Sequence, residues 1–152
     1  MAWKLIPSEA DECSVWIDWT RLVYFRGQPL SERVVMIPNQ RTKKSVQTAI
    51  LTRLGMRAGF PDYMVLARDH NFAGLFLEAK RVGGRSSAEQ LVWREHLLDW
   101  GYVAHICEGA RELVAATRAY FACFRPGDFV DRTDLIDINQ QVRLPQQRSS
   151  FP

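Results

Sequence analysis

The chain has 152 residues, of which 47% are apolar, and this length and composition fit one globular domain with its own hydrophobic core. No apolar run approaches the roughly 20 residues of a membrane-spanning helix, and the N-terminus lacks the apolar region of a signal peptide. We therefore expect an intracellular protein with no membrane partner. The formal net charge of +3 indicates little by itself, but Arg outnumbers Lys, and Arg is the better side chain for bidentate phosphate contacts.

Cysteine and histidine spacing excludes two common kinds of site. The odd number of cysteines, with no CxxC pair, predicts neither a disulfide framework nor a zinc site; they are Cys13, Cys107 and Cys123. The histidines show no helical ligand pairing, and we expect structural or surface roles for all of them: His70, His96 and His105.

The first expected element is a helix that Ser8 caps and that runs to about Phe25. Its core-facing residues recur at helical spacing: Cys13, Trp16, Ile17, Thr20 and Tyr24. Glu12 lies one turn before Trp16, at the edge of this face, where a carboxylate can turn inward toward a metal. The alternative is that Glu12 only stabilises the first turn through the helix dipole, as Glu9 and Asp11 would serve equally well.

A basic region follows the first helix. We expect a turn at 27–30, a short strand at 33–37, a polar loop at 39–44, and a helix at 45–54 that Gly55 ends. No acidic residue occurs from Arg33 to Pro61, a segment that carries Arg33, Arg41, Lys43, Lys44, Arg53 and Arg57. A second basic cluster contains Lys80, Arg81 and Arg85. These clusters suit a phosphate backbone, the alternative being a solvated basic face.

The stretch GFPDYMVLARDHNFAGLFLEAK, at 59–80, carries the chemistry. Strands at 63–67 and 74–80, joined as a hairpin, would bring Asp62 opposite the end of the second strand. Alternation places Glu78 and Lys80 on one face of that strand, roughly 6 to 7 Å apart. Two carboxylates beside a Lys suit Mg²⁺ or Mn²⁺, with the ammonium orienting water or stabilising phosphate charge. The plainer interpretation is a turn and a weak surface ion pair.

The rest of the chain completes an α/β pattern. A basic loop at 82–85 leads to a helix that Ser86 or Ser87 caps and that ends at Trp100, with Gln90 able to close a capping box. A buried-type strand at 102–107 and a helix at 110–124 follow. The order predicts a small mixed β-sheet with helices on both faces, formed by residues 1–124. We expect residues 125–152 to form a tail that is partly extended, around 135–138, or mobile.

Five segments in order resemble the virus-type replication-repair nuclease (VRR-NUC) family of the PD-(D/E)xK nuclease superfamily. They are Ser8–Glu12, Ile37–Asn39, Gly59–Asp62, Gly74–Lys80 and Ser87–Gln90, and the resemblance covers about residues 8 to 124. The residue after Glu12 is often Gln in the family and is Cys13 here. The resemblance implies a restriction-endonuclease-like core.

It also implies a metal-dependent DNA endonuclease. Asp62 and Glu78 would hold Mg²⁺ or Mn²⁺, with Glu12 directly or through water, and with the Ala79 carbonyl. Lys80 would orient the attacking water, and Gln90 would bind water or a phosphate. The expected nucleic-acid contacts are Asn39, Arg41, Lys43, Lys44, Arg81 and Arg85.

The resemblance further suggests branched DNA such as four-way junctions as the substrate, a homodimer, and a viral or bacterial host cell as the setting. Two alternatives stay open from the residues themselves: a nucleic-acid-binding module that does not cleave, and a nuclease that acts on RNA. Clustered carboxylates repel phosphate, and pure binding has no use for them, which favours cleavage over binding alone.

Overall fold

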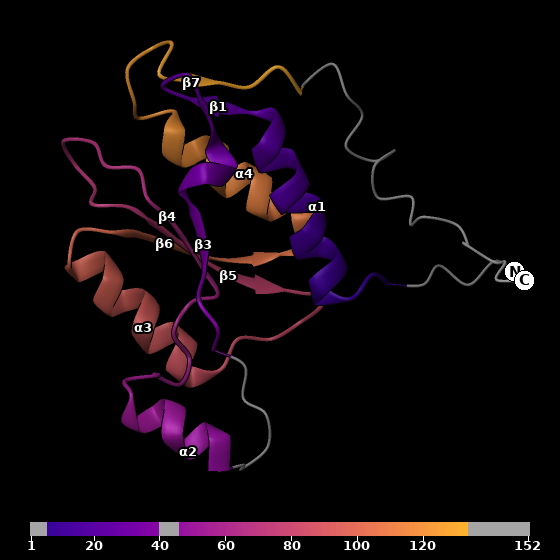
Figure 1. Cartoon of the computed structure of the whole chain (residues 1–152), viewed down its shortest axis with the longest axis vertical. Coiled ribbons are helices and arrows are strands. Elements are labelled where there is room, and N and C mark those ends of the chain that lie inside the picture. The colour runs from indigo at the N-terminus through magenta and orange to yellow at the C-terminus, as the bar shows by residue number, and fades with distance from the viewer. Residues whose placement is uncertain (1–5, 40–45, 134–152) are drawn as a thin grey trace, which may run out of the picture.

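A four-stranded mixed sheet organises the molecule (Figure 1). The computed structural model describes residues 6–39 and 46–133. The strands lie in the order β3-β4-β5-β6, and only the β5–β6 pair is parallel. Their bounds are Val34–Met36 for β3, Tyr63–Val65 for β4, Leu75–Lys80 for β5 and Val103–Glu108 for β6. The expected hairpin is confirmed, since Tyr63 pairs with Leu77 and Val65 with Leu75.

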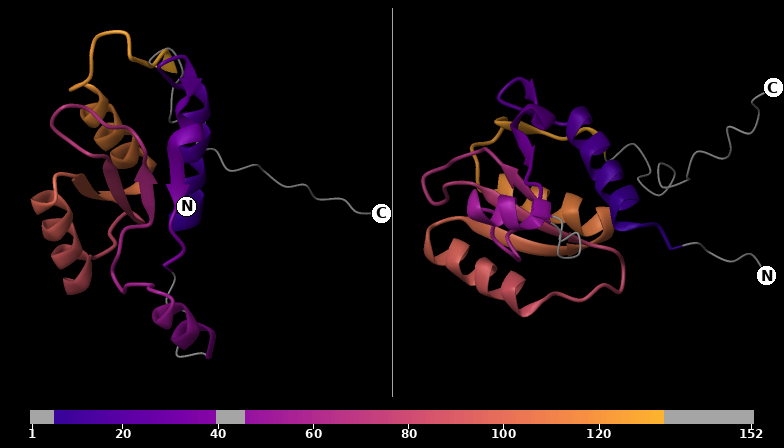
Figure 2. Two further views of the ribbon diagram at one scale, coloured as in Figure 1. Left: turned by 60° about the vertical axis from the view of Figure 1, so that its left-hand side comes forward. Right: turned by 60° about the horizontal axis from the view of Figure 1, so that its bottom comes forward.

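Helices cover both faces of this sheet, as the sequence predicted (Figures 1 and 2). Helices α1 (Glu9–Leu22) and α4 (Gly109–Phe121) pack on one face, over Leu75, Leu77 and Ala79. Helix α3 (Ala88–Asp99) packs on the other, where Phe76, Leu97 and Ala104 form a smaller cluster. Because both faces of β5 are covered, its side chains are buried up to Ala79. Within the part of the chain that the structure describes, no helix is long and apolar enough to cross a membrane.

A second, smaller sheet replaces the end of the expected first helix. The helix ends at Leu22 rather than Phe25, and the strands, in the order β2-β1-β7, are Tyr24–Phe25 (β1), Gln28–Pro29 (β2) and Phe129–Val130 (β7). Phe25 is buried against Phe121 and Phe124, whereas Tyr24, expected in the core, is exposed. A 3₁₀ helix at Leu30–Arg33, which the sequence did not predict, then leads into β3.

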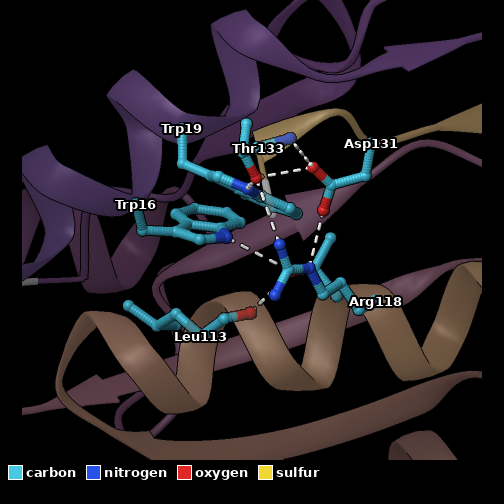
Figure 3. Close-up of polar contacts among 7 residues, drawn as sticks. Trp16, Trp19, Leu113, Arg118, Asp131 and Thr133 are labelled. Atoms are coloured by element: carbon cyan, nitrogen blue, oxygen red, sulfur yellow. Dashed lines mark hydrogen bonds and ion pairs between the residues drawn. The ribbon is translucent and has the colours of Figure 1, made fainter. Parts of the chain in front are cut away.

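A polar network joins the segment after α4 to α1 (Figure 3). Arg118 binds Asp131 at 2.6 Å and donates to Thr133 at 3.1 Å, and the Trp19 indole donates to the same Thr133 hydroxyl at 3.0 Å. Trp16 donates to Thr117 at 3.2 Å in the same region. Residues 125–133, placed in the tail by sequence, therefore pack on the domain. The extended segment expected at 135–138 lies outside the described residues.

Helix α2 (Val46–Arg53) lies at one end of the molecule, apart from the sheet (Figure 2). Among the described residues it has no buried side chain. Its apolar side chains Val46 and Ile50 are 80% and 51% exposed, and Leu54, directly after the helix, is 78% exposed. On α3, Leu97 is buried as expected, but Leu98 is exposed, because α3 covers the sheet with a narrow stripe of side chains.

Candidate active site

The candidate site lies where β4 begins and β5 ends. The register that pairs Tyr63 with Leu77 brings Asp62 beside the end of β5, as the sequence predicted. The backbone amide of Ala79 donates to Asp62 Oδ2 at 2.9 Å, which fixes the carboxylate across the two strands. The Asp62 carbonyl accepts from Ile37 at 2.7 Å, so β3 also holds this residue in place.

Glu78 and Lys80 form a close ion pair on one face of β5. Lys80 Nζ lies 2.5 Å from Glu78 Oε1. The Lys80 side chain is 14% exposed and the Glu78 side chain is 6% exposed. This pair is therefore not the solvated surface ion pair of the plainer interpretation. The shared face that strand alternation predicted is confirmed.

Gln90 closes the capping box, one of the two roles that the sequence left open, and it also contacts Glu78. Its Oε1 accepts from the Ser87 amide at 2.9 Å, and Ser87 Oγ accepts from the Gln90 amide at 3.3 Å, which closes the capping box of α3. Its Nε2 also donates to Glu78 Oε1. The start of α3 is thereby tied to the carboxylate at the end of β5.

Two short loop contacts set the approach of Pro61 and Asp62. Asn39 Nδ2 donates to the carbonyl of Phe60, directly before this pair. Gly59 has φ of +77°, and a Cβ there would lie 2.6 to 2.9 Å from atoms of Glu89 and Gln90. Only glycine allows so close an approach with this backbone conformation. The loop is thereby packed against the start of α3.

The buried Glu78 and the half-buried Asp62 both have raised pKa values. Burial raises the pKa of Glu78 to about 7, and the charge of Asp62 adds to this, while the hydrogen bond and charge of Lys80 oppose it. Burial likewise raises the pKa of Asp62, against the hydrogen bond from the Ala79 amide. A bound cation would favour the charged form of both groups.

The donor set fits a hard divalent cation. Glu78 Oε2 is buried and has no hydrogen-bond partner among the described residues. A carboxylate oxygen that binds a metal is left in this state when the metal is absent. Asp62 and the Ala79 carbonyl are the neighbouring oxygen donors, and oxygen ligands are those that Mg²⁺ prefers. Among the described residues, no set of three His, Cys, Asp or Glu side chains is placed to hold an ion. Further ligands would have to be carbonyls or water.

Glu12, expected to complete the site directly or through water, contacts the start of α4. Its buried carboxylate accepts a hydrogen bond from the Ala110 amide at 2.8 Å, at the start of α4. Glu108, the N-cap residue of α4, makes no capping hydrogen bond with its side chain. Gly109, with φ of +74°, allows the close packing, since a Cβ there would lie 3.3 Å from Glu12 Oε2. Glu9 is exposed, and its charge contributes to the raised pKa of Glu78.

The expected nucleic-acid contacts fall into three groups. Asn39 donates to the Phe60 carbonyl, within the protein. Arg81 and Arg85 are exposed in the loop directly after β5, beside Lys80. Arg41, Lys43 and Lys44 lie outside the described residues. Sequence reasoning missed Arg94 and His105, which line a cavity of about 360 Å³ together with Lys80. Burial, and then the charge of Arg94, lower the pKa of His105. Their separation in sequence gave no signal for this grouping.

Comparison with known proteins finds a similar fold. No protein-family model matches the chain, and no curated protein does. Among solved structures, the chain is similar to one described as a VRR_NUC domain protein, with a TM-score of 0.68 and 23% sequence identity. The similarity covers 78% of this chain and 91% of that chain. The restriction-endonuclease-like fold that the sequence resemblance implied is therefore confirmed.

Proposed function

We propose that the protein is a metal-dependent DNA endonuclease that hydrolyses phosphodiester bonds. The observation that carries this proposal is the grouping of buried Glu78 with half-buried Asp62 and Lys80, in which one Glu78 oxygen has no hydrogen-bond partner among the described residues. Burying two carboxylates together costs free energy, and a domain that only binds nucleic acid has no use for that arrangement. The nuclease-type fold of the similar structure supports the same function.

Asp62, Glu78 and the Ala79 carbonyl would hold Mg²⁺ or Mn²⁺. When bound, the ion supplies Lewis acidity and a lowered pKa for coordinated water. Lys80 Nζ, already 2.5 Å from Glu78, orients the attacking water and stabilises charge on the phosphate. Gln90 keeps Glu78 in place from the start of α3 and offers its amide to water or a phosphate oxygen. Arg81 and Arg85 bind the backbone beside the cut.

Cleavage of labelled DNA tests the function. Linear, flap and four-way-junction substrates are incubated with Mg²⁺ or Mn²⁺ and the native chain, Asp62→Ala or Lys80→Ala. We expect metal-dependent cutting that falls about 10²- to 10⁴-fold in either variant, the range that a positioned catalytic side chain supplies. Arg21→Ala, a change on the exposed face of α1, serves as the control and should cut normally.

Binding of every substrate without metal, and cutting of none, would contradict the nuclease and favour a binding module. Matched RNA substrates in the same assay separate a DNA nuclease from an RNA nuclease.

We further propose that branched DNA is the preferred substrate and that two copies of the chain act together. The exposed apolar face of α2 supports a two-fold dimer, because an apolar helix face of this size is usually covered. Two sites related by a two-fold axis would meet two strands of a four-way junction.

A further inference from the structure

A second cavity lies at the opposite end of β5 from the candidate active site. It has a volume of about 580 Å³ and lies between the loop that joins β4 to β5, the turn after β1 and the segment after α4. The residues that matter for its chemistry are Arg26, Arg68, Asp69, His70, Arg125 and Asp128. These segments are far apart in sequence, so no local motif indicates the cavity.

Contacts on each side hold the cavity walls in place. Arg26 binds Asp128 at 3.0 Å, which joins the turn after β1 to the segment after α4. The Tyr120 hydroxyl donates to the carbonyl of Ala67, directly before the β4–β5 loop. Phe124 packs edge-on against Phe25, with ring centroids 5.2 Å apart. The cavity is therefore a fixed feature of the fold.

Both carboxylates in the cavity are already engaged. Asp128 binds Arg26, and Asp69 Oδ1 accepts from the backbone amides of Asn71 at 2.8 Å and Phe72 at 2.6 Å. In contrast, the exposed side chains of Arg68 and Arg125 form no ion pair with a carboxylate among the described residues. His70 lies beside them. The cavity therefore presents two uncommitted guanidinium groups.

We propose that this cavity binds phosphate groups of the nucleic-acid backbone, away from the scissile phosphate. One guanidinium group can bind two phosphate oxygens at once. Two such groups in one cavity therefore fit the successive phosphates of a nucleic-acid backbone better than they fit a carboxylate surface. The inference deepens the proposed function and rests on it only for the identity of the substrate. The six residues of β5 separate the cavity from Lys80 by about 20 Å, which corresponds to about six base pairs of duplex. Substrates must extend beyond that length to reach both places.

Binding to duplexes of two lengths, measured in EDTA, tests the proposal without any cleavage. The probes are hairpin-closed DNA duplexes of about 4 and about 24 base pairs, titrated over a range of salt concentrations. The test variant is Arg68→Gln with Arg125→Gln. The control is Arg111→Gln with Arg132→Gln, which removes the same charge from exposed positions that do not line the cavity. Thermal unfolding verifies that both variants fold.

We expect the test variant to bind the long duplex about tenfold more weakly and to lower its salt slope by about 2, with little change for the short duplex. The control should lack this dependence on length. Native affinity and slope on the long duplex, or the same length-selective loss in the control, would overturn the proposal. Titration with inorganic phosphate separates the sources: loss of phosphate binding alone, with duplex binding intact, would assign the cavity to a free anion and overturn the nucleic-acid assignment.

The two proposals fail separately. If the native protein cuts no DNA but the Arg68→Gln, Arg125→Gln variant still shows the length-selective loss of binding, the cavity is a nucleic-acid site and the nuclease proposal is wrong. If the native protein cuts DNA but the variant shows no such loss, the nuclease proposal stands and the proposal for the cavity is wrong.

Discussion

Glu78 makes the metal-free protein less stable as the pH rises. Its pKa is about 7 in the folded chain, against 4.5 for an ordinary Glu, so between these values the folded state holds a proton that the unfolded state has lost. The free energy of unfolding therefore falls as pH rises from about 4.5 to about 7. Thermal unfolding in EDTA across this window should show the fall, and Glu78→Gln should remove most of it. Glu95→Gln, at an exposed position, should keep it.

A divalent cation should reverse this loss of stability. Binding to the folded state alone raises the free energy of unfolding by RT ln(1 + [L]/Kd), about 2.7 kcal/mol at a hundred times Kd. We expect Mg²⁺ or Mn²⁺ to raise the Tm at pH 8 in the native chain, above the pKa of about 7 of Glu78, and to leave Asp62→Ala nearly unchanged. An equal rise in both proteins would place the ion outside the candidate site.

Glu9 and Glu12, one turn apart on α1, should respond differently to substitution. Glu12→Ala leaves the Ala110 amide without its acceptor, so we expect the free energy of unfolding to fall by about 1 to 3 kcal/mol. Glu9→Ala, at an exposed position, should change it by less than about 0.5 kcal/mol. In EDTA, Tm falls as the pH rises. Removing the Glu9 charge should shift this fall to lower pH, because that charge raises the pKa of Glu78. Loss of cleavage without loss of stability in Glu12→Ala would instead favour the role in metal binding that the family resemblance implied.

At the level of elements, a half-buried ion pair helps to hold the segment after α4. Asp131 binds Arg118, and its side chain is 10% exposed. The pKa of Asp131 is lowered because the hydrogen bonds from Arg118 and Thr133 outweigh the opposing effect of burial, so its contribution to stability is lost as pH falls through the folded pKa. Asp131→Ala should lower the free energy of unfolding by about 1 to 3 kcal/mol, because it removes charge-assisted hydrogen bonds with Arg118 and Thr133.

Asp128→Ala is the matched control, because Asp128 pairs with the more exposed Arg26 and should cost less than about 1 kcal/mol. Chemical denaturation of both variants measures the difference. Equal losses would mean that the network shown in Figure 3 does not hold the segment.

The sequence predicted those elements whose signals are local. The β4–β5 hairpin was predicted from the alternation of side chains along the strands and from the turn at Pro61 that precedes β4. The capping box of α3 can be identified from Ser87 and Gln90 alone. The end of α1 was misjudged because Tyr24 continues the helical spacing. Its strand pairing depends on Val130, which is more than a hundred residues away. The contact of Gln90 with Glu78 and that of Glu12 with Ala110 are equally non-local, so spacing predicted their positions but not all of their partners.

At the scale of the whole molecule, α2 is the element that the domain leaves unsupported. An isolated helix of this length is marginal in water, and most helices gain their stability by packing an apolar face. The apolar face of α2 contains Val46, Ile50 and Leu51, with Leu54 directly after the helix, and all of these side chains are exposed. A second copy of the chain would present the same face, and identical apolar faces can pack across a two-fold axis.

If two copies of the chain pair through α2, as proposed, Ile50→Glu should convert that dimer to a monomer without unfolding the domain. A charge at the centre of a buried apolar interface has no partner, whereas in the free chain Ile50 is already 51% exposed. Sedimentation velocity measures the change in mass, with Leu66→Glu, an exposed apolar position outside α2, as the control that should stay dimeric. If two joined sites cut a four-way junction, the variant should lose paired incisions and retain single cuts on a flap. A native chain that sediments as a monomer, or a variant that stays dimeric, would remove α2 from the interface and leave its apolar face to another partner.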